Sequence, residues 1–135
     1  MRTPRVEQVD AEVARAARPL LDPGETVRVA AWATDRSRPA GLSEMLLGGL
    51  ARRRRSCLLA LTPDRLLVFD AAADGAAGDL ILDEPLARLR TVTDRTWFGW
   101  TTVEILQANG KLRRFDFPAS FADAAEAIGD ALQRR

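Results

Sequence analysis

The chain has 135 residues, of which 47% are apolar and 29% are charged, and its formal net charge is +1. This length is enough for one domain with a single hydrophobic core, and the small net charge gives no overall attraction to nucleic acid or membranes. One cysteine and no histidine are present, which excludes a disulfide framework and a multi-cysteine metal site. We expect a cytoplasmic protein, because the sequence shows neither a signal peptide nor an apolar run of about 20 residues.

The N-terminal part of the chain is predicted to be a helix. Valines and alanines recur at helical spacing over residues 5–18, and Pro19 disfavours a continuation of the helix. The apolar stripe is narrow and consists of small side chains, which suits a helix lying on a sheet. We therefore expect residues 1–21 to form a helix that packs on a domain formed by residues 22–135.

The centre of the predicted core is the segment 56–70, SCLLALTPDRLLVFD. Its apolar runs 57–61 and 66–69 flank a turn with proline at its second position. Short apolar runs bounded by turn residues are typical of paired strands. Both faces of this hairpin are apolar, so we expect both to be covered by other elements.

Five further strands are predicted, which gives seven strand candidates in all. Between two of them, residues 94–99 are predicted to form a loop that carries Trp97 and Phe98, and we expect Trp100 to fill the core. The five further strands are predicted over residues 26–34, 79–83, 89–93, 101–107 and 111–117.

The last two strands meet at Asn109-Gly110, which is a strong hairpin signal. A three-residue loop over residues 108–110 pairs Val103 with Phe115 and keeps charge off the buried face. A shift of one residue in the pairing register would move the buried side chains of a strand to the solvent face. We therefore predict this loop, with Gly110 in the left-handed region.

A C-terminal helix is predicted to begin at Ser120, with Phe121, Ile128 and Leu132 on one apolar face. The order of elements predicts an α+β fold that is mainly β. Two antiparallel sheets closed at one end by the C-terminal helix fit this order.

Three motifs accompany this order of elements: DPGE at 22–25, LALTPDRLLVFD at 59–70 and G-K-x-x-x-F-x-F-P at 110–118. In this combination, over residues 20–135, the chain resembles the bacterial PH domains of the wider PH and GRAM-like group. The resemblance implies a seven-stranded antiparallel β-sandwich or partly open barrel, capped by the C-terminal helix, with the N-terminal helix as an addition. It implies a ligand-presenting scaffold and not an enzyme, although fold alone does not assign function.

The segment 35–55 is the first candidate functional site. It is long for a connection inside a compact domain, and it contains six arginines but only two carboxylates. Guanidinium groups suit phosphate, and an amphipathic segment beside a basic cluster can lie at a membrane surface. The alternative is a solvated loop whose leucines pack on the core. The predicted lipid- or anion-binding residues are Arg28, Arg36, Arg38, Arg52, Arg53, Arg54 and Arg55, and the predicted interface residues of this segment are Leu42, Met45 and Leu46.

The resemblance bears on the same segment, because PH domains generally hold anionic lipid headgroups with basic residues between their first two strands. The spacing Arg28-x7-Arg36-x-Arg38 is similar to that basic pattern, with arginine in place of the usual lysine. Several bacterial members assemble through strand edges instead.

Trp97 and Phe98 form the second candidate site, since exposed aromatic side chains at a loop mark interfaces. A packed structural corner is the alternative.

Catalysis is not expected, because no histidine or tyrosine is present and Cys57 lies within a strand with no imidazole to activate it. No glycine-rich phosphate loop follows a strand, and we expect no cofactor and no metal. Nucleic acid is not an expected partner, because no stacking aromatics are interleaved with the basic patch.

The sequence therefore predicts a non-catalytic interaction module. Its expected partner is an anionic membrane surface or an acidic protein, bound by the basic segment 35–55. The alternative is a structural domain that forms homo-oligomers through Trp97 and Phe98.

Overall fold

The computed structural model describes residues 3–36 and 55–133. The predicted interface residues Leu42, Met45 and Leu46 lie outside these ranges. The main elements within them are α1 (Val6–Ala17), β1 (Val29–Asp35), β2 (Arg55–Leu61), β3 (Arg65–Ala71), β4 (Ala77–Pro85), β5 (Leu89–Trp97), β6 (Trp100–Gln107), β7 (Leu112–Pro118) and α3 (Ala122–Gln133), and the short 3₁₀ helices are η1 (Arg18–Leu20), η2 (Leu86–Arg88) and η3 (Ala119–Phe121).

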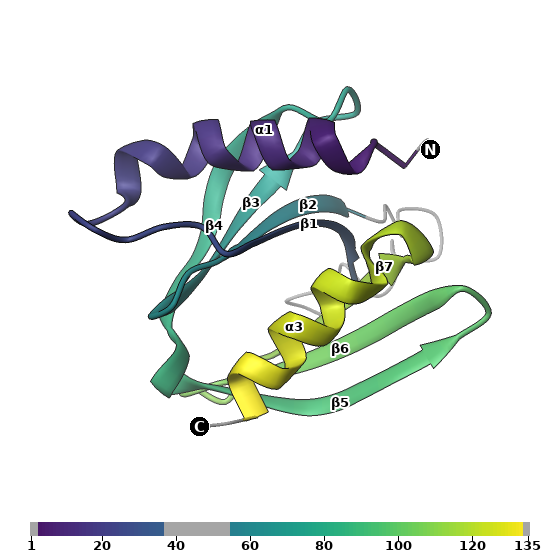
Figure 1. The fold of residues 1–135 in the computed structure, drawn as a ribbon. Coiled ribbons are helices and arrows are strands. Elements are labelled where there is room, and N and C mark those ends of the chain that lie inside the picture. The colour runs from purple at the N-terminus through teal and green to yellow at the C-terminus, as the bar shows by residue number, and fades with distance from the viewer. Residues whose placement is uncertain (1–2, 37–54, 134–135) are drawn as a thin grey trace, which may run out of the picture.

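The fold is mainly β, with a helix at each end of the chain, as predicted (Figure 1). The strands form one antiparallel sheet in the order β4-β3-β2-β1-β7-β6-β5, so the prediction of two separate sheets is wrong. The sheet is not closed, because β4 and β5 are its two edges among the described strands. Within the described ranges, no helix has the length and apolar character needed to cross a membrane.

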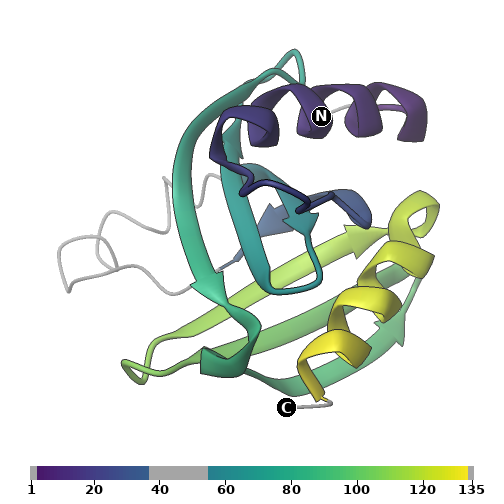
Figure 2. The ribbon, with the colours of Figure 1, turned by 60° about the vertical axis from the view of Figure 1, so that its left-hand side comes forward.

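The sheet bends where β1 meets β7. This seam has two residue pairs, Thr34 with Asp116 and Asp35 with Phe115. On either side of the seam the strands diverge, so that the two halves of the sheet face one another with α3 across the open side (Figure 2). The buried residues of α3, which include Ala125, Ile128 and Leu132, belong to the core.

The hairpin of β2 and β3 lies at the centre of the core, as expected. Leu58, Leu59 and Leu67 are completely buried although neighbours along a strand point to opposite faces. One face is covered by α1, which packs against β1 and β2. This helix buries Val9 and Val13, which are one helical turn apart.

The predicted register of the last hairpin is confirmed. Val103 pairs with Phe115 and Thr101 with Phe117, and all four side chains face the core. Gly110 has a φ of 86°, the left-handed conformation that the three-residue loop requires.

The predicted loop over residues 94–99 is wrong. Strand β5 continues to Trp97, which pairs with Trp100, so that Phe98 and Gly99 alone form the turn within this hairpin. Polar side chains over residues 94–96 gave no strand signal, but an edge strand can expose them to solvent. Trp100 is half-buried and does not fill the core, whereas Trp32 is 4% exposed and belongs to it.

An ion-pair cluster joins the start of the domain to the central hairpin. Arg65 binds Glu25 with two nitrogens, Nε to Oε2 at 3.0 Å and Nη2 to Oε1 at 2.8 Å. Its Nη1 donates to Asp83 at 3.0 Å, and the hydroxyl of Thr62 donates to Glu25 at 2.8 Å. The Glu25–Arg65 cluster therefore ties the DPGE motif to β3 and β4.

Candidate functional site

The two ends of the arginine-rich segment meet at one place on the sheet. Asp35, the last residue of β1, pairs with Arg55, the first residue of β2. The backbone N–H of Arg36 donates to the carbonyl oxygen of Arg114 in β7 at 2.8 Å. We call Arg36, Arg55, Arg113 and Arg114 the arginine edge.

A buried carboxylate holds two members of the arginine edge. The Asp116 side chain is 5% exposed, and its Oδ2 accepts a hydrogen bond from Nη1 of Arg36 at 3.1 Å. Nε of Arg114 lies 3.7 Å from Oδ1 of the same carboxylate. One aspartate therefore faces two guanidinium groups, and the surface above it keeps positive charge.

The other two members extend this charge. Nη1 of Arg113 lies 3.6 Å from Oδ2 of Asp35, and Arg55 is exposed to solvent. Glu104, a further carboxylate, is opposite Arg114 in the ladder between β6 and β7. Four arginines against three carboxylates leave a net positive edge, to which Arg55 contributes an exposed charge.

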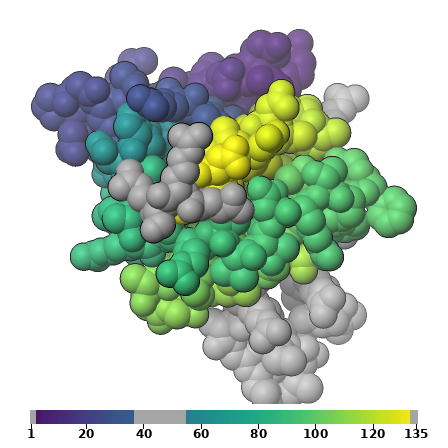
Figure 3. Space-filling model, turned by 60° about the horizontal axis from the view of Figure 1, so that its bottom comes forward, coloured from purple at the N-terminus to yellow at the C-terminus, as the bar shows by residue number. Residues whose placement is uncertain are grey.

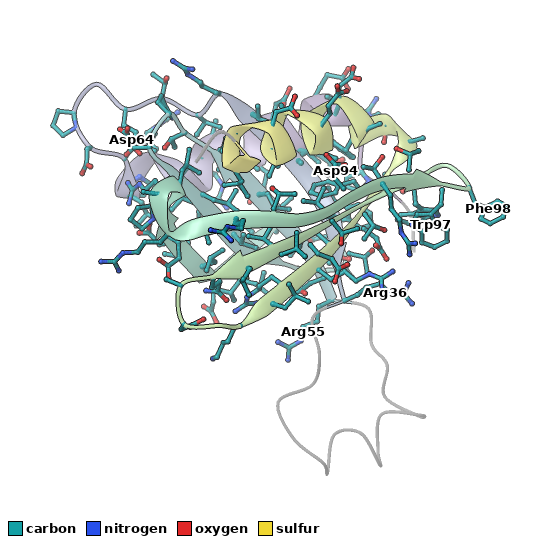
Figure 4. All side chains as sticks on the ribbon, turned by 90° about the horizontal axis from the view of Figure 1, so that it is seen from below. Arg36, Arg55, Asp64, Asp94, Trp97 and Phe98 are labelled. Carbon is teal, nitrogen blue, oxygen red and sulfur yellow. The ribbon has the colours of Figure 1, made fainter. Side chains whose placement is uncertain are left out.

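A hydrogen-bond chain connects the arginine edge to the aromatic side chains of β5. The hydroxyl of Thr102 donates to Asp116 at 2.7 Å and accepts the indole N–H of Trp97 at 2.7 Å. The chain crosses three strands and fixes the orientation of the Trp97 ring. Figure 4 shows Trp97 and Arg36 on the same side of the sheet.

The turn between β5 and β6 presents an exposed aromatic side chain. Phe98 is 95% exposed, and its ring meets that of Trp97 edge-on, with centroids 6.2 Å apart. Phe98 has a φ of 42°, a left-handed conformation that is unusual for a bulky residue, and Gly99 follows with a φ of 80°. We call Trp97, Phe98 and Trp100 the aromatic tip; the hairpin that carries it reaches the margin of the molecule (Figure 3).

The backbone of Phe98 gives a first prediction. Replacing Phe98 by asparagine is expected to raise the free energy of unfolding by about 1 kcal/mol, because asparagine tolerates the left-handed region and a phenyl group does not. Urea unfolding followed by circular dichroism measures this change. Phe98→Ala serves as the control, since alanine keeps the strain; an equal gain for alanine would contradict the explanation.

The structure does not bring all of the predicted arginines together. The N–H of Arg28 donates to Leu61 at the opposite end of β1 from Arg36, and seven strand residues put about 20 Å between those ends. Arg28 therefore does not join the arginine edge. Four further predicted residues lie outside the described ranges: Arg38, Arg52, Arg53 and Arg54.

Two members of the arginine edge were not predicted from the sequence. Arg113 and Arg114 are far from the segment 35–55 in sequence, and they reach it because β7 pairs with β1. Only the pairing of β1 with β7 could have revealed them, and the periodicity of a strand does not specify which other strand it pairs with.

The opposite side of β5 is acidic. Asp94 and three carboxylates of α3, namely Asp123, Glu126 and Asp130, line a hollow of about 320 Å³. Burial raises the pKa of Asp94, and the charge of Asp130 raises it further. Among the described residues, no group of acidic or cysteine side chains is arranged to hold a metal ion.

No protein-family model matches this sequence, and the comparison with curated proteins finds no match. The function must therefore be inferred from the arginine edge and the aromatic tip.

Proposed function

We propose that the protein is a non-catalytic, PH-like binding module that docks its arginine edge on an anionic lipid surface. The observation that carries this proposal is the meeting of Arg36 and Arg55 beside Arg113 and Arg114 of β7. Four guanidinium groups, from strands β2 and β7 and from the residue that follows β1, concentrate positive charge on a chain whose net charge is +1.

The chemistry of the arginine edge favours phosphate. A planar guanidinium group can bind two phosphate oxygens at once and is more weakly hydrated than an ammonium group. The chain between Arg36 and Arg55 supplies four more arginines in its sequence. Each basic side chain near an anionic bilayer contributes about 1 kcal/mol of attraction, so a group of this size is sufficient for measurable binding.

The fold supports a scaffold role. A mainly β domain with seven antiparallel strands and a C-terminal helix is consistent with the PH-like resemblance of the motifs at 22–25, 59–70 and 110–118. In such a scaffold the connection between the first two strands is free to carry the ligand-binding residues, and here that connection begins and ends at the arginine edge.

Vesicle flotation tests this proposal. The chain is mixed with vesicles of neutral phospholipid or with vesicles that also contain anionic phospholipid, at low and moderate salt. We expect binding to the anionic vesicles alone, and we expect it to weaken as salt rises, because surface charges are screened. Replacing Arg52–Arg55 by serine is expected to reduce binding at least tenfold.

A matched variant separates position from total charge. Replacing four exposed arginines elsewhere, Arg5, Arg18, Arg28 and Arg88, by serine changes the net charge by the same amount. This variant is expected to bind anionic vesicles nearly as well as the unmodified chain. Equal loss in both variants would show that binding depends on total charge and not on Arg52–Arg55 at the arginine edge, and absence of binding to any vesicle would overturn the lipid proposal in favour of an acidic protein partner.

A further inference from the structure

The aromatic tip combines two features that oppose stability in water. The Phe98 side chain is almost fully exposed, and its backbone adopts a conformation that glycine or asparagine would adopt at lower free energy. Strained backbone at an exposed position is a basis for a functional hypothesis. The phenyl group has no apolar environment in the described structure other than the edge of Trp97.

The surroundings of the tip indicate which face meets a ligand. The indole of Trp97 is connected through Thr102 and Asp116 to Arg36, so the tip and this member of the arginine edge share one side of the sheet (Figure 4). The carboxylates beside α3 lie on the other side of β5. An anionic surface is attracted by the first side and repelled by the second.

We propose that, when the arginine edge docks on an anionic bilayer, the Phe98 side chain inserts between the headgroups and the upper acyl chains. This inference rests on the proposed function and adds an apolar anchor and an orientation to it. Tryptophan rings favour the interface between headgroups and acyl chains, and Trp97 and Trp100 flank Phe98 at that depth. The bilayer supplies the apolar environment that the phenyl group lacks in water.

Tryptophan quenching by lipids with brominated acyl chains tests the insertion. We expect brominated anionic vesicles to quench part of the emission, since Trp97 and Trp100 lie beside the inserted ring. Trp32 belongs to the core and provides an unquenched background. Phe98→Asn is expected to bind about tenfold more weakly and to lose the quenching, because the apolar contact is removed.

Two controls keep the result interpretable. Phe98→Asn retains a residue suited to the turn, so weaker binding cannot be attributed to unfolding. Phe98→Leu restores apolar bulk and is expected to restore both binding and quenching. If all three proteins bind anionic vesicles equally and none is quenched, the insertion is wrong while the docking of the arginine edge stands.

Other outcomes overturn the insertion in different ways. If no variant binds any vesicle, the proposed function fails and the insertion fails with it. Size-exclusion chromatography of the same proteins tests for self-association. A chain that forms dimers, together with a Phe98→Asn variant that is monomeric and still binds vesicles equally, would identify a second copy of this chain as the occupant of the tip.

Discussion

Replacing Arg65 by alanine is expected to lower the free energy of unfolding by about 2–3 kcal/mol. The guanidinium group binds Glu25 through two hydrogen bonds and Asp83 through a third nitrogen. The Glu25 side chain is 5% exposed, so the variant leaves a poorly hydrated carboxylate without its cation. The Asp83 contact adds little, because that side chain is 37% exposed and solvent screens it.

The same cluster predicts a loss of stability in acid. Hydrogen bonds from Arg65, the largest cause, and from the backbone of Asp22 and the Thr62 hydroxyl together lower the pKa of Glu25 to about 2, against the effect of burial. The unfolded chain has the ordinary value of 4.5. A lowered pKa in the folded state stabilises above the unfolded pKa, so this contribution is complete above pH 4.5 and is lost as pH falls towards 2.

Urea unfolding over this pH range measures both effects. The unmodified chain is expected to lose stability between pH 4.5 and 2, and Arg65→Ala is expected to show a flatter profile. Arg90→Ala removes an exposed arginine and should change stability by less than about 0.5 kcal/mol. A profile for Arg65→Ala as steep as that of the unmodified chain would contradict the assignment of the lowered pKa to Arg65.

Replacing Asp116 by alanine is expected to cost a similar amount, about 2–3 kcal/mol. The carboxylate accepts hydrogen bonds from Thr102 and Arg36 and lies beside Arg114. Alanine would leave the buried hydroxyl of Thr102 without its acceptor and two arginines without their counter-charge. The side chain of Arg36 is 33% exposed and can regain water, which limits the cost.

Asparagine at position 116 separates the hydrogen bond from the charge. Asp116→Asn keeps one acceptor oxygen and is expected to cost about 1 kcal/mol, less than alanine. Urea unfolding followed by circular dichroism measures both variants. Equal stability of the alanine variant and the unmodified protein would show that the hydrogen bonds that connect Trp97 to Arg36 contribute nothing to the free energy of unfolding.

The sequence was most informative where one face of a strand had to be buried. The register of β6 and β7 followed from keeping charge off the face of Val103 and Phe115, because a slip of one residue is costly there. The central hairpin was identified in the same way. By contrast, the second half of β5 is an edge with polar side chains over residues 93–96, where burial sets no pattern.

The candidate site was predictable in part. The sequence indicated Arg36 and Arg55 because they flank a long basic connection, and it indicated Trp97 and Phe98 because exposed aromatic residues at a predicted loop mark interfaces. It could not associate Arg113 and Arg114 with them, since that association depends on the pairing of β1 with β7. Local periodicity carries no information about which distant strands become neighbours.

The seam between β1 and β7 divides the sheet into two halves, each of which is a continuous part of the sequence. Strands β1 to β4 form one meander of consecutive hairpins, and β5 to β7 form another. Five of the six ladders among the described strands therefore join strands that are consecutive in sequence, and only the ladder between β1 and β7 does not. The seam and α3 join the two meanders, because α3 contacts β1 of the first and β5 and β6 of the second. Because the arginine edge is built across that seam, it exists only when both meanders are folded and paired.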